Sequence, residues 1–208
     1  MMSSPSSGRI ALAEELFRIG AIRFGRFTLA SGKPSSYYLD LRILPSNPDA
    51  YAMEIGAYKS LVQEIGQDGF DVVAGVATAG VTVSSILSFQ LKKPMVYVRK
   101  EEKGHGLGRL VEGAVLPGWR ALVVDDLVTT GGSIISAVEG LRKAGCTVNT
   151  AAVLVDRLEG GSENLAAIGV RLRKYADVKE LASILYERKK LIKRDYESVV
   201  KQIEGDKV

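Results

Sequence analysis

The residues best suited to chemistry lie between positions 121 and 134, which read Ala-Leu-Val-Val-Asp-Asp-Leu-Val-Thr-Thr-Gly-Gly-Ser-Ile. Two carboxylates follow an apolar run, and a loop of small residues comes next: Asp125, Asp126, then Thr129, Thr130, Gly131, Gly132 and Ser133. Backbone N–H groups at the start of a helix bind phosphate, and glycines let the anion approach closely. The carboxylates would repel a phosphate beside them, but they suit sugar hydroxyls or a developing cation. The stretch therefore predicts a site for ribose 5-phosphate, unless Ser133 only caps a helix and the acids only form a turn.

A second charged stretch follows residue 98 and holds Arg99, Lys100, Lys103 and the only histidine, His105, together with three glycines. A flexible cationic loop of this kind can close over a polyphosphate and exclude water. His105 can also donate a proton to a leaving oxygen. The alternative interpretation is a surface loop of mixed charge, which such runs form just as often.

Two other turns carry weaker signals for anion binding. Residues 75–80, Gly-Val-Ala-Thr-Ala-Gly, lead from an apolar run into a helix, and their small side chains leave the backbone open to an anion. Arg157 follows the apolar run at 150–155 and can hold a carboxylate through a bidentate pair. It can equally be a surface residue that pairs with Asp156 or Glu159.

The elements that must position these residues alternate along the chain. Four short apolar runs predict buried strands, at 71–76, 94–98, 120–124 and 150–155. Helical patterns occur at 81–91 and at 134–141, with Gly145 placed to end the second helix. This alternation predicts an α/β fold with a parallel sheet covered by helices on both faces. Ligands bind beyond the carboxyl ends of strands in such sheets, so the four turns are expected at one edge.

The rest of the chain is expected to complete a single domain over residues 9–208, after a flexible tail at 1–8. Helical patterns cover residues 10–19 and 48–64, and the charged segment from 178 onward also suits helices. A polar, aromatic stretch at 25–42 suits a hairpin.

Composition predicts a soluble, cytoplasmic protein. The 208 residues contain no apolar run near the ~20 residues of a membrane span, and the N-terminus lacks the apolar core of a signal peptide. Cys146 is the only cysteine, so no disulfide can form within the chain. The net charge of +4 fits an anionic ligand and gives no reason to expect nucleic acid or a membrane as a partner.

The stretch 121–134 resembles the motif by which type I phosphoribosyltransferases bind 5-phosphoribosyl 1-pyrophosphate (PRPP). Further segments resemble the orotate phosphoribosyltransferase family within that group. Its N-terminal hood, pyrophosphate loop, mobile catalytic loop and orotate clamp are matched, in the family's order, by residues 27–40, 75–80, 98–106 and 156–157. The resemblance covers about residues 10–160.

This resemblance implies a type I phosphoribosyltransferase core with a small hood at about residues 20–45 and C-terminal helices. The implied reaction converts orotate and PRPP into orotidine 5′-monophosphate and pyrophosphate, a step of pyrimidine (UMP) biosynthesis. Mg²⁺ is the implied cofactor, carried mainly on PRPP oxygens and water, with no metal site built by the protein. A homodimer is also implied, because the family's mobile loop serves the site of the neighbouring subunit.

The family's residue roles transfer at the matching positions. Asp125 and Asp126 would hold the ribose hydroxyls and stabilise positive charge at the anomeric carbon, while Lys103 and His105 would act on the leaving pyrophosphate. Orotate would be bound by Arg157, through its carboxylate, and by Thr129, Tyr37 and Tyr38. PRPP would be bound by Arg99, Lys100, Lys103, His105, Asp125, Asp126, Leu127, Val128, Thr129, Thr130, Gly131, Gly132 and Ser133.

Two positions depart from the family pattern. Ala30 stands where many members have a lysine that reaches the pyrophosphate, and Thr78 stands where many members have another lysine. Lys33 or the loop at 99–105 can compensate for these lysines, and the departures leave the implied reaction unchanged.

Two other functions match parts of the sequence. A purine phosphoribosyltransferase shares the ribose motif, but Arg157 and the loop at 99–105 argue against a base without a carboxylate. A nucleotide-sensing, RNA-binding regulator of the same fold would use the basic tail, which contains Arg188, Lys189, Lys190, Lys193 and Arg194. A run of this kind is more often the solvated face of a helix.

Overall fold

Six strands form a mostly parallel sheet in the part of the chain that the computed structural model describes, residues 5–29, 32–100 and 110–205. Their order across the sheet is β5-β4-β3-β6-β7-β8. The strands are β3 (Val72–Val76), β4 (Met95–Val98), β5 (Val111–Glu112), β6 (Arg120–Val128), β7 (Thr147–Asp156) and β8 (Arg171–Asp177). Only β5 runs antiparallel to its neighbour among these described strands. The predicted α/β fold and its four predicted strands are confirmed.

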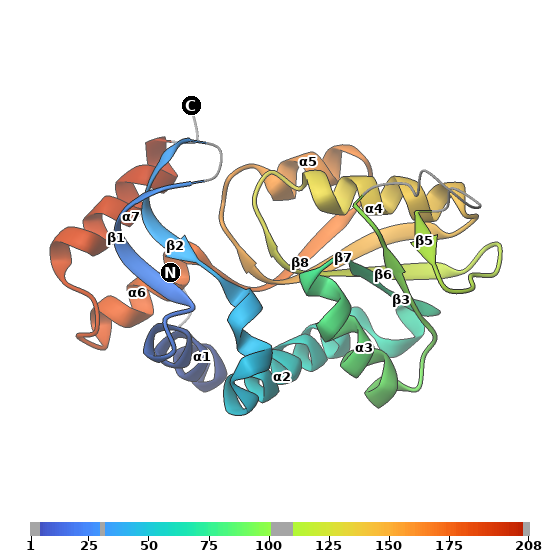
Figure 1. Cartoon of the computed structure of the whole chain (residues 1–208), viewed down its shortest axis with the longest axis horizontal. Coiled ribbons are helices and arrows are strands. Elements are labelled where there is room, and N and C mark those ends of the chain that lie inside the picture. Colours follow the sequence, from blue (N-terminus) through green and yellow to red (C-terminus); the bar gives the residue numbers. More distant parts are fainter. Residues whose placement is uncertain (1–4, 30–31, 101–109, 206–208) are drawn as a thin grey trace.

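Helices cover both faces of this sheet (Figure 1). Helices α2 (Pro48–Ile65) and α3 (Ala79–Leu91) lie on one face, and α4 (Gly132–Lys143) and α5 (Gly161–Ala167) lie on the other. Successive side chains of a strand point to opposite faces. Leu122 and Val124 of β6 accordingly pack in the core with α2 and α3, whereas Val123 packs in a separate core with α4. Burial on both faces explains why the central strands are continuous apolar runs.

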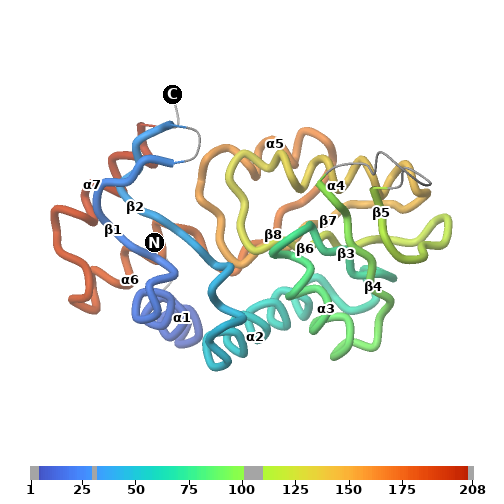
Figure 2. The backbone as a smooth tube through the Cα atoms, in the orientation of Figure 1, coloured from blue at the N-terminus to red at the C-terminus, as the bar shows by residue number. Residues whose placement is uncertain are grey.

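Both ends of the chain meet in a second unit, on the left of Figure 1. This terminal unit comprises α1 (Ser7–Arg18), a hairpin of β1 (Ile22–Thr28) and β2 (Pro34–Leu39), α6 (Val178–Glu187) and α7 (Lys193–Gly205). The antiparallel strands β1 and β2, called the hood hairpin below, confirm the hairpin predicted at 25–42. Figure 2 shows α7 lying along this hairpin, so the first and last parts of the sequence are packed together. Short 3₁₀ helices, η1 (Leu41–Ser46) and η2 (Gln67–Gly69), flank α2.

Two expected boundaries need correction. Ser7 and Gly8, expected in a flexible tail, are the first residues of α1, because the Ser6 side chain accepts a hydrogen bond from the Arg9 N–H and caps the helix. Strand β6 continues past Val124 to Val128, because its last residues pair with the end of β7. The two acids therefore lie within the end of the strand and not in the turn after it.

The elements β5, α5 and β8 have no clear sequence signal. Strand β5 has two residues, and four of the seven residues of β8 are charged, as is common where a strand lies at the edge of a sheet. Helix α5 has only seven residues, too few for a helical period to stand out. None of the helices in the described ranges is long and apolar enough to cross a membrane.

Candidate active site

A cavity of about 490 Å³ opens where β6 ends and α4 begins. This edge of the sheet holds the carboxyl ends of the parallel strands, where α/β folds bind ligands. The cavity is lined by most of the residues that were expected to bind PRPP: Lys100, Asp125, Asp126, Leu127, Val128, Thr129, Gly131, Gly132 and Ser133. The structure thus brings the carboxylate pair and the small-residue loop to one place.

The carboxylate pair is almost buried and held by backbone groups. Asp125 is 9 % exposed, and one of its carboxylate oxygens accepts a hydrogen bond from the Asp126 N–H at 3.0 Å. Asp126 in turn accepts from the Leu127 N–H at 2.9 Å, and the Tyr58 hydroxyl donates to the backbone oxygen of Asp125. Burial raises the pKa of both carboxyl groups, and the neighbouring Asp126 charge raises that of Asp125 further. A positive charge developing beside them would favour their ionised forms and would be stabilised by them in return.

The loop after this pair has the geometry of a phosphate site. Gly131 has φ +87°, in the left-handed region that favours glycine, and it directly precedes α4. The N-cap residue of α4 is Gly131, which has no side chain, so Ser133, the second residue of the helix, is not the cap that the alternative interpretation required. The Asn164 side-chain amide donates to the Thr130 carbonyl at 2.9 Å and fixes the loop from α5. Because the N-cap residue has no side chain, the backbone N–H groups at the start of α4 can bind an anion.

The turn at 75–80 contributes less than expected. Ala77, Thr78 and Ala79 line the cavity, but the two glycines of the turn serve packing. A Cβ on Gly80 would lie 2.3 Å from the Val124 carbonyl oxygen, and one on Gly75 would lie 2.2 Å from the Ser84 hydroxyl. These glycines therefore let α3 approach β3 and β6, and anion binding by the backbone of this turn stays a prediction.

Two cavity residues were missed by sequence reasoning. Asp40 and Arg42 follow β2, line the cavity and form an ion pair with Nε 2.7 Å from Oδ1. The Arg42 charge opposes the burial that raises the pKa of Asp126, so it reaches the acid pair electrostatically. In the sequence, these residues are recognisable as two opposite charges directly after the predicted hairpin. Their place in the cavity depends on how the hairpin packs against the core.

Glu54 is a third missed residue. It lies on α2, is 2 % exposed and lines a small cavity together with Asp126, Thr78 and Arg42. Burial, aided by the Asp126 charge, raises the pKa of Glu54 to about 8. The spacing of Ala50, Glu54 and Tyr58 at intervals of four places Glu54 on the buried face of the helix, and this was the signal in the sequence.

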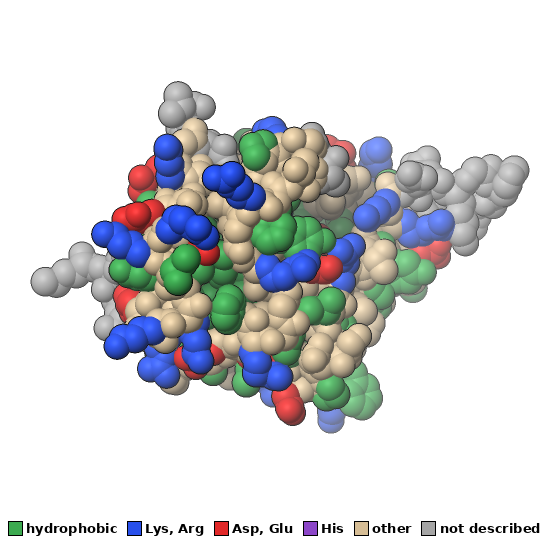
Figure 3. Space-filling view, turned by 60° about the vertical axis from the view of Figure 1, so that its left-hand side comes forward, with side chains coloured by type: hydrophobic (Ala, Val, Ile, Leu, Met, Phe, Trp, Pro, Cys, Tyr) green, Lys and Arg blue, Asp and Glu red, His purple; other side chains and the backbone are tan. Residues whose placement is uncertain are grey.

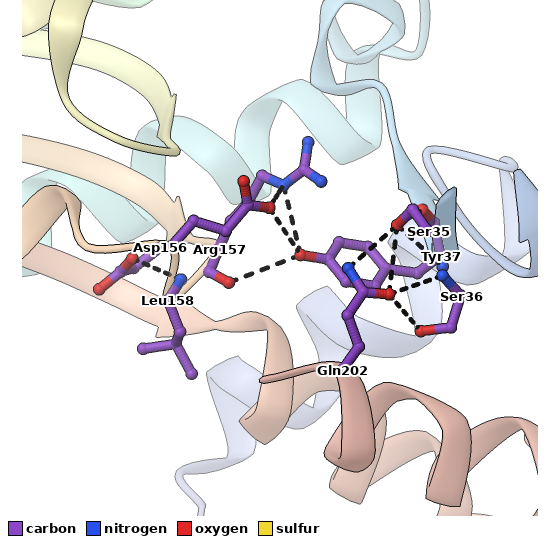
Figure 4. A network of polar contacts seen from close by, with 8 residues as sticks. Ser35, Ser36, Tyr37, Asp156, Arg157, Leu158 and Gln202 are labelled. Atoms are coloured by element: carbon purple, nitrogen blue, oxygen red, sulfur yellow. Dashed lines mark hydrogen bonds and ion pairs between the residues drawn. The ribbon is translucent and has the colours of Figure 1, made fainter. Parts of the chain in front are cut away.

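Arg157 is buried at the end of β7 and held by three groups (Figure 4). Its Nε lies 2.8 Å from a Glu159 carboxylate oxygen and donates to the Tyr37 hydroxyl at 3.3 Å. The guanidinium also lies over the Tyr37 ring, 5.0 Å from its centroid. Its Nη2 is buried with no hydrogen-bond partner among the described residues. An unpaired buried N–H is costly, so this atom marks a place for a ligand acceptor.

The other predicted residues are placed less directly. Tyr37 is fully buried and its hydroxyl contacts Arg157 and Glu159, whereas Tyr38 stacks against Arg23 at 4.9 Å. Arg99 Nη1 pairs with Glu112 at 3.4 Å. Lys103 and His105, as well as Ala30, lie outside the described residues.

A second cavity of about 1230 Å³ lies beside the hood hairpin and α7. Thr130 and Glu159 line it from the core, and Gln202 lines it from α7. On the face that brings the terminal unit forward, Lys and Arg side chains are spread around a middle region of apolar side chains (Figure 3). Both cavities thus border the phosphate loop, Thr129 lining the first and Thr130 the second.

Known proteins match this chain over most of its length. A model of the phosphoribosyl transferase domain matches residues 47–188. The orotate phosphoribosyltransferase of Cenarchaeum symbiosum is 46 % identical over 187 residues, which cover 89 % of this chain and 92 % of the relative.

Solved structures give the same relationship. The crystal structure of orotate phosphoribosyltransferase from Aeropyrum pernix is 44 % identical with a TM-score of 0.75, covering 86 % of this chain and 98 % of that one. The Mycobacterium tuberculosis orotate phosphoribosyltransferase in complex with PRPP is 31 % identical with a TM-score of 0.67, covering 84 % of this chain and 98 % of that one. The chain belongs to the phosphoribosyltransferases and, within them, to the orotate phosphoribosyltransferase family.

Proposed function

We propose that this chain transfers the 5-phosphoribosyl group of PRPP to orotate, giving orotidine 5′-monophosphate and pyrophosphate in pyrimidine biosynthesis. The observation that carries this proposal is a single cavity in which Asp125 and Asp126 adjoin the uncapped start of α4. A phosphate on the loop places a ribose over the two acids, at the carboxyl edge of the sheet. The solved relative in complex with PRPP supports the same ligand here.

Bond breaking at the anomeric carbon builds positive charge on the sugar and negative charge on pyrophosphate. Asp125 and Asp126 hold the ribose hydroxyls and stabilise the cationic sugar. Thr129, Thr130, Gly131, Gly132 and Ser133 hold the 5-phosphate, with Leu127 and Val128 leading into the loop. Pyrophosphate is held by Lys100, which lines the cavity, and by Arg99, Lys103 and His105, with Thr78 at its edge.

Arg157 is the proposed site for the orotate carboxylate. Its guanidinium is buried, oriented by Glu159 and Tyr37, and has an N–H without a partner among the described residues. A carboxylate would supply the missing acceptor through a charge-assisted hydrogen bond. Tyr37 acts here by orienting Arg157, because its fully buried ring and its engaged hydroxyl suit that role better than stacking on the base. Tyr38 and Thr129 complete the contacts with orotate.

Mg²⁺ is the proposed cofactor. The ion would arrive on the phosphates of PRPP, because Mg²⁺ keeps several waters and is commonly bound through substrate phosphates. When bound there, Mg²⁺ neutralises charge on the leaving pyrophosphate. The residues around the cavity would still position the two substrates and stabilise the charge that develops on the sugar.

A homodimer with shared sites is the proposed assembly. Phe89 on α3 is 84 % exposed and Met53 on α2 is 40 % exposed, large values for apolar side chains. Between these helices lies a hollow of about 470 Å³ that includes Tyr51, Ile55 and Ile86. Exposed apolar surface of this kind is typical of a protein contact. A second copy packed on this face would bury that apolar surface.

A direct assay tests the proposed function. Purified protein is incubated with PRPP, Mg²⁺ and orotate, and the fall in ultraviolet absorbance of orotate is followed. Loss of absorbance that requires both PRPP and Mg²⁺ is the expected result. Turnover of adenine or hypoxanthine in place of orotate, or of no base at all, would reject the proposal.

A further inference from the structure

Gln202 on α7 connects the C-terminal helix to the strand that carries Tyr37 (Figure 4). Its Oε1 accepts hydrogen bonds from the Ser36 N–H at 2.7 Å and from the Ser36 hydroxyl at 2.8 Å. Its Nε2 donates to the Ser35 hydroxyl at 3.3 Å, and that hydroxyl donates to the Tyr37 carbonyl at 2.7 Å. Both polar ends of the Gln202 amide therefore engage the residues just before Tyr37.

The hood hairpin needs such support. Strand β2 has β1 as its strand neighbour in a two-stranded sheet, so its other edge presents backbone groups for pairing. An isolated two-stranded hairpin is marginally stable in water and depends on packing against another element. Gln202 supplies an acceptor for the Ser36 N–H, as a third strand would, and so fixes β2 against α7.

The same strand reaches Arg157 on the core. The Tyr37 hydroxyl accepts from Arg157 Nε and donates to Glu159, both at 3.3 Å. A chain of contacts thus runs from Gln202 through Ser35 and Ser36 to Tyr37, and from there to the guanidinium. A small shift of β2 would move the Tyr37 hydroxyl and release one of the groups that hold Arg157.

We propose that Gln202 is a positioning residue for carboxylate recognition, acting through β2 and Tyr37 on the orientation of Arg157. The inference rests on the proposed function, in which Arg157 binds the carboxylate of orotate. It makes the C-terminal helix part of the base-binding site, although α7 lies outside residues 47–188, which the phosphoribosyl transferase domain matches. A binding group acts well only when supporting residues hold it in its productive geometry.

Kinetics of Gln202→Met test this inference, because methionine keeps a similar length and removes both polar ends. The KM for orotate is expected to rise roughly fivefold, the value of about one hydrogen bond, while the KM for PRPP stays near that of the wild type. Gln202→Glu keeps an acceptor for Ser36 and should retain most of the affinity for orotate. Ser198→Ala is the matched control, since Ser198 is exposed one turn earlier on α7 and bonds to the Arg194 carbonyl of its own helix.

A double-mutant cycle with Tyr37→Phe tests whether Gln202 acts on Arg157 through the Tyr37 hydroxyl. If Gln202 acts through the Tyr37 hydroxyl, Gln202→Met adds little to the effect of Tyr37→Phe. Fully additive effects, equal rises in both KM values, or a lowered Tm with unchanged KM would overturn the inference. Gln202→Asn, whose amide is too short to reach Ser36, replaces the methionine variant if that variant does not fold. If the wild-type protein does not convert orotate, the proposed function is rejected. If the wild type converts orotate and Gln202→Met has the same KM for orotate, only this inference is rejected.

Discussion

Glu54 on α2 and Asp126 at the end of β6 line the same cavity of about 180 Å³, so a third carboxyl group lies next to the acid pair. Burial and the Asp126 charge raise the pKa of Glu54 from its ordinary 4.5 to about 8. Glu54 is therefore mostly protonated at pH 7 and adds little charge to the pair. Such a group makes the stability of the fold depend on pH.

Replacement of Glu54 by glutamine should flatten this pH dependence. The folded state holds the Glu54 proton more tightly than the unfolded chain, so this contribution to the free energy of unfolding is complete below pH 4.5 and is lost as pH rises towards 8. The Glu54→Gln variant lacks it and should lose less stability over this range, by up to about 1.4 kcal/mol per pH unit. Urea denaturation across that range measures the difference. Exposed Glu64 on the same helix gives the control, Glu64→Gln, and parallel curves for Glu54→Gln and the wild type would contradict the prediction.

Arg157→Lys should separate the two substrates. Lysine keeps the charge but loses the fork of N–H groups and the contacts of Nε with Glu159 and Tyr37. The KM for orotate is expected to rise tenfold or more, about the value of a charge-assisted hydrogen bond, with little change in the KM for PRPP. Steady-state kinetics with each substrate varied in turn measure this. Arg171→Lys on the exposed side of β8 should leave both values unchanged, and equal rises in Arg157→Lys would argue against a carboxylate site.

Gly131→Ala should damage the phosphate loop specifically. Alanine at φ +87° is expected to cost roughly 1–2 kcal/mol of stability, and its Cβ would lie 3.4 Å from the Gly161 carbonyl. Gly169 has φ +75°, and a Cβ added there would meet no atom of the described residues within 4 Å, so Gly169→Ala bears a similar backbone cost away from the cavity. Both variants should show lower unfolding free energies, but only Gly131→Ala should raise the KM for PRPP. A comparable rise in Gly169→Ala would assign the effect to general destabilisation.

Phe89→Asp should produce monomers. A charge on the most exposed large apolar side chain of α3 would oppose burial against a second copy. Light scattering should show half the mass of the wild type, and activity should fall because each site would lack its neighbour's loop. Ile192→Asp, at an apolar residue that is 58 % exposed in the terminal unit, is the control. A dimer that persists in Phe89→Asp would place the contact elsewhere.

The carboxyl edge of the sheet could be predicted from the sequence, because its groups are contiguous. A strand, two acids, a small-residue loop and a helix occupy residues 120–143 without a break, and each has a local signal. The place of Arg157 could be predicted for the same reason, since this residue follows β7 directly. The full length of β6 could not be predicted from the sequence, because it depends on pairing with β7.

Residues from other parts of the chain could not be assigned to the site in this way. Glu54 lies beside Asp126 because α2 packs on the sheet, and Gln202 meets Ser36 because the two ends of the chain fold into one unit. Tyr37 was expected to contact the base, but its burial and its bond with Arg157 depend on how the hood hairpin meets the core. Local patterns give no information on contacts between residues 167 positions apart, such as Ser35 and Gln202.

The most direct test of the central claim is a competition assay that identifies the nucleotide product. Wild-type protein is incubated with PRPP, Mg²⁺ and equal concentrations of orotate, adenine and hypoxanthine. The nucleotide products are separated and identified by mass spectrometry. Orotidine 5′-monophosphate is expected as the dominant product, and its formation should be lost in Arg157→Ala. A purine nucleotide as the dominant product, or unchanged formation of orotidine 5′-monophosphate by Arg157→Ala, would contradict the central claim.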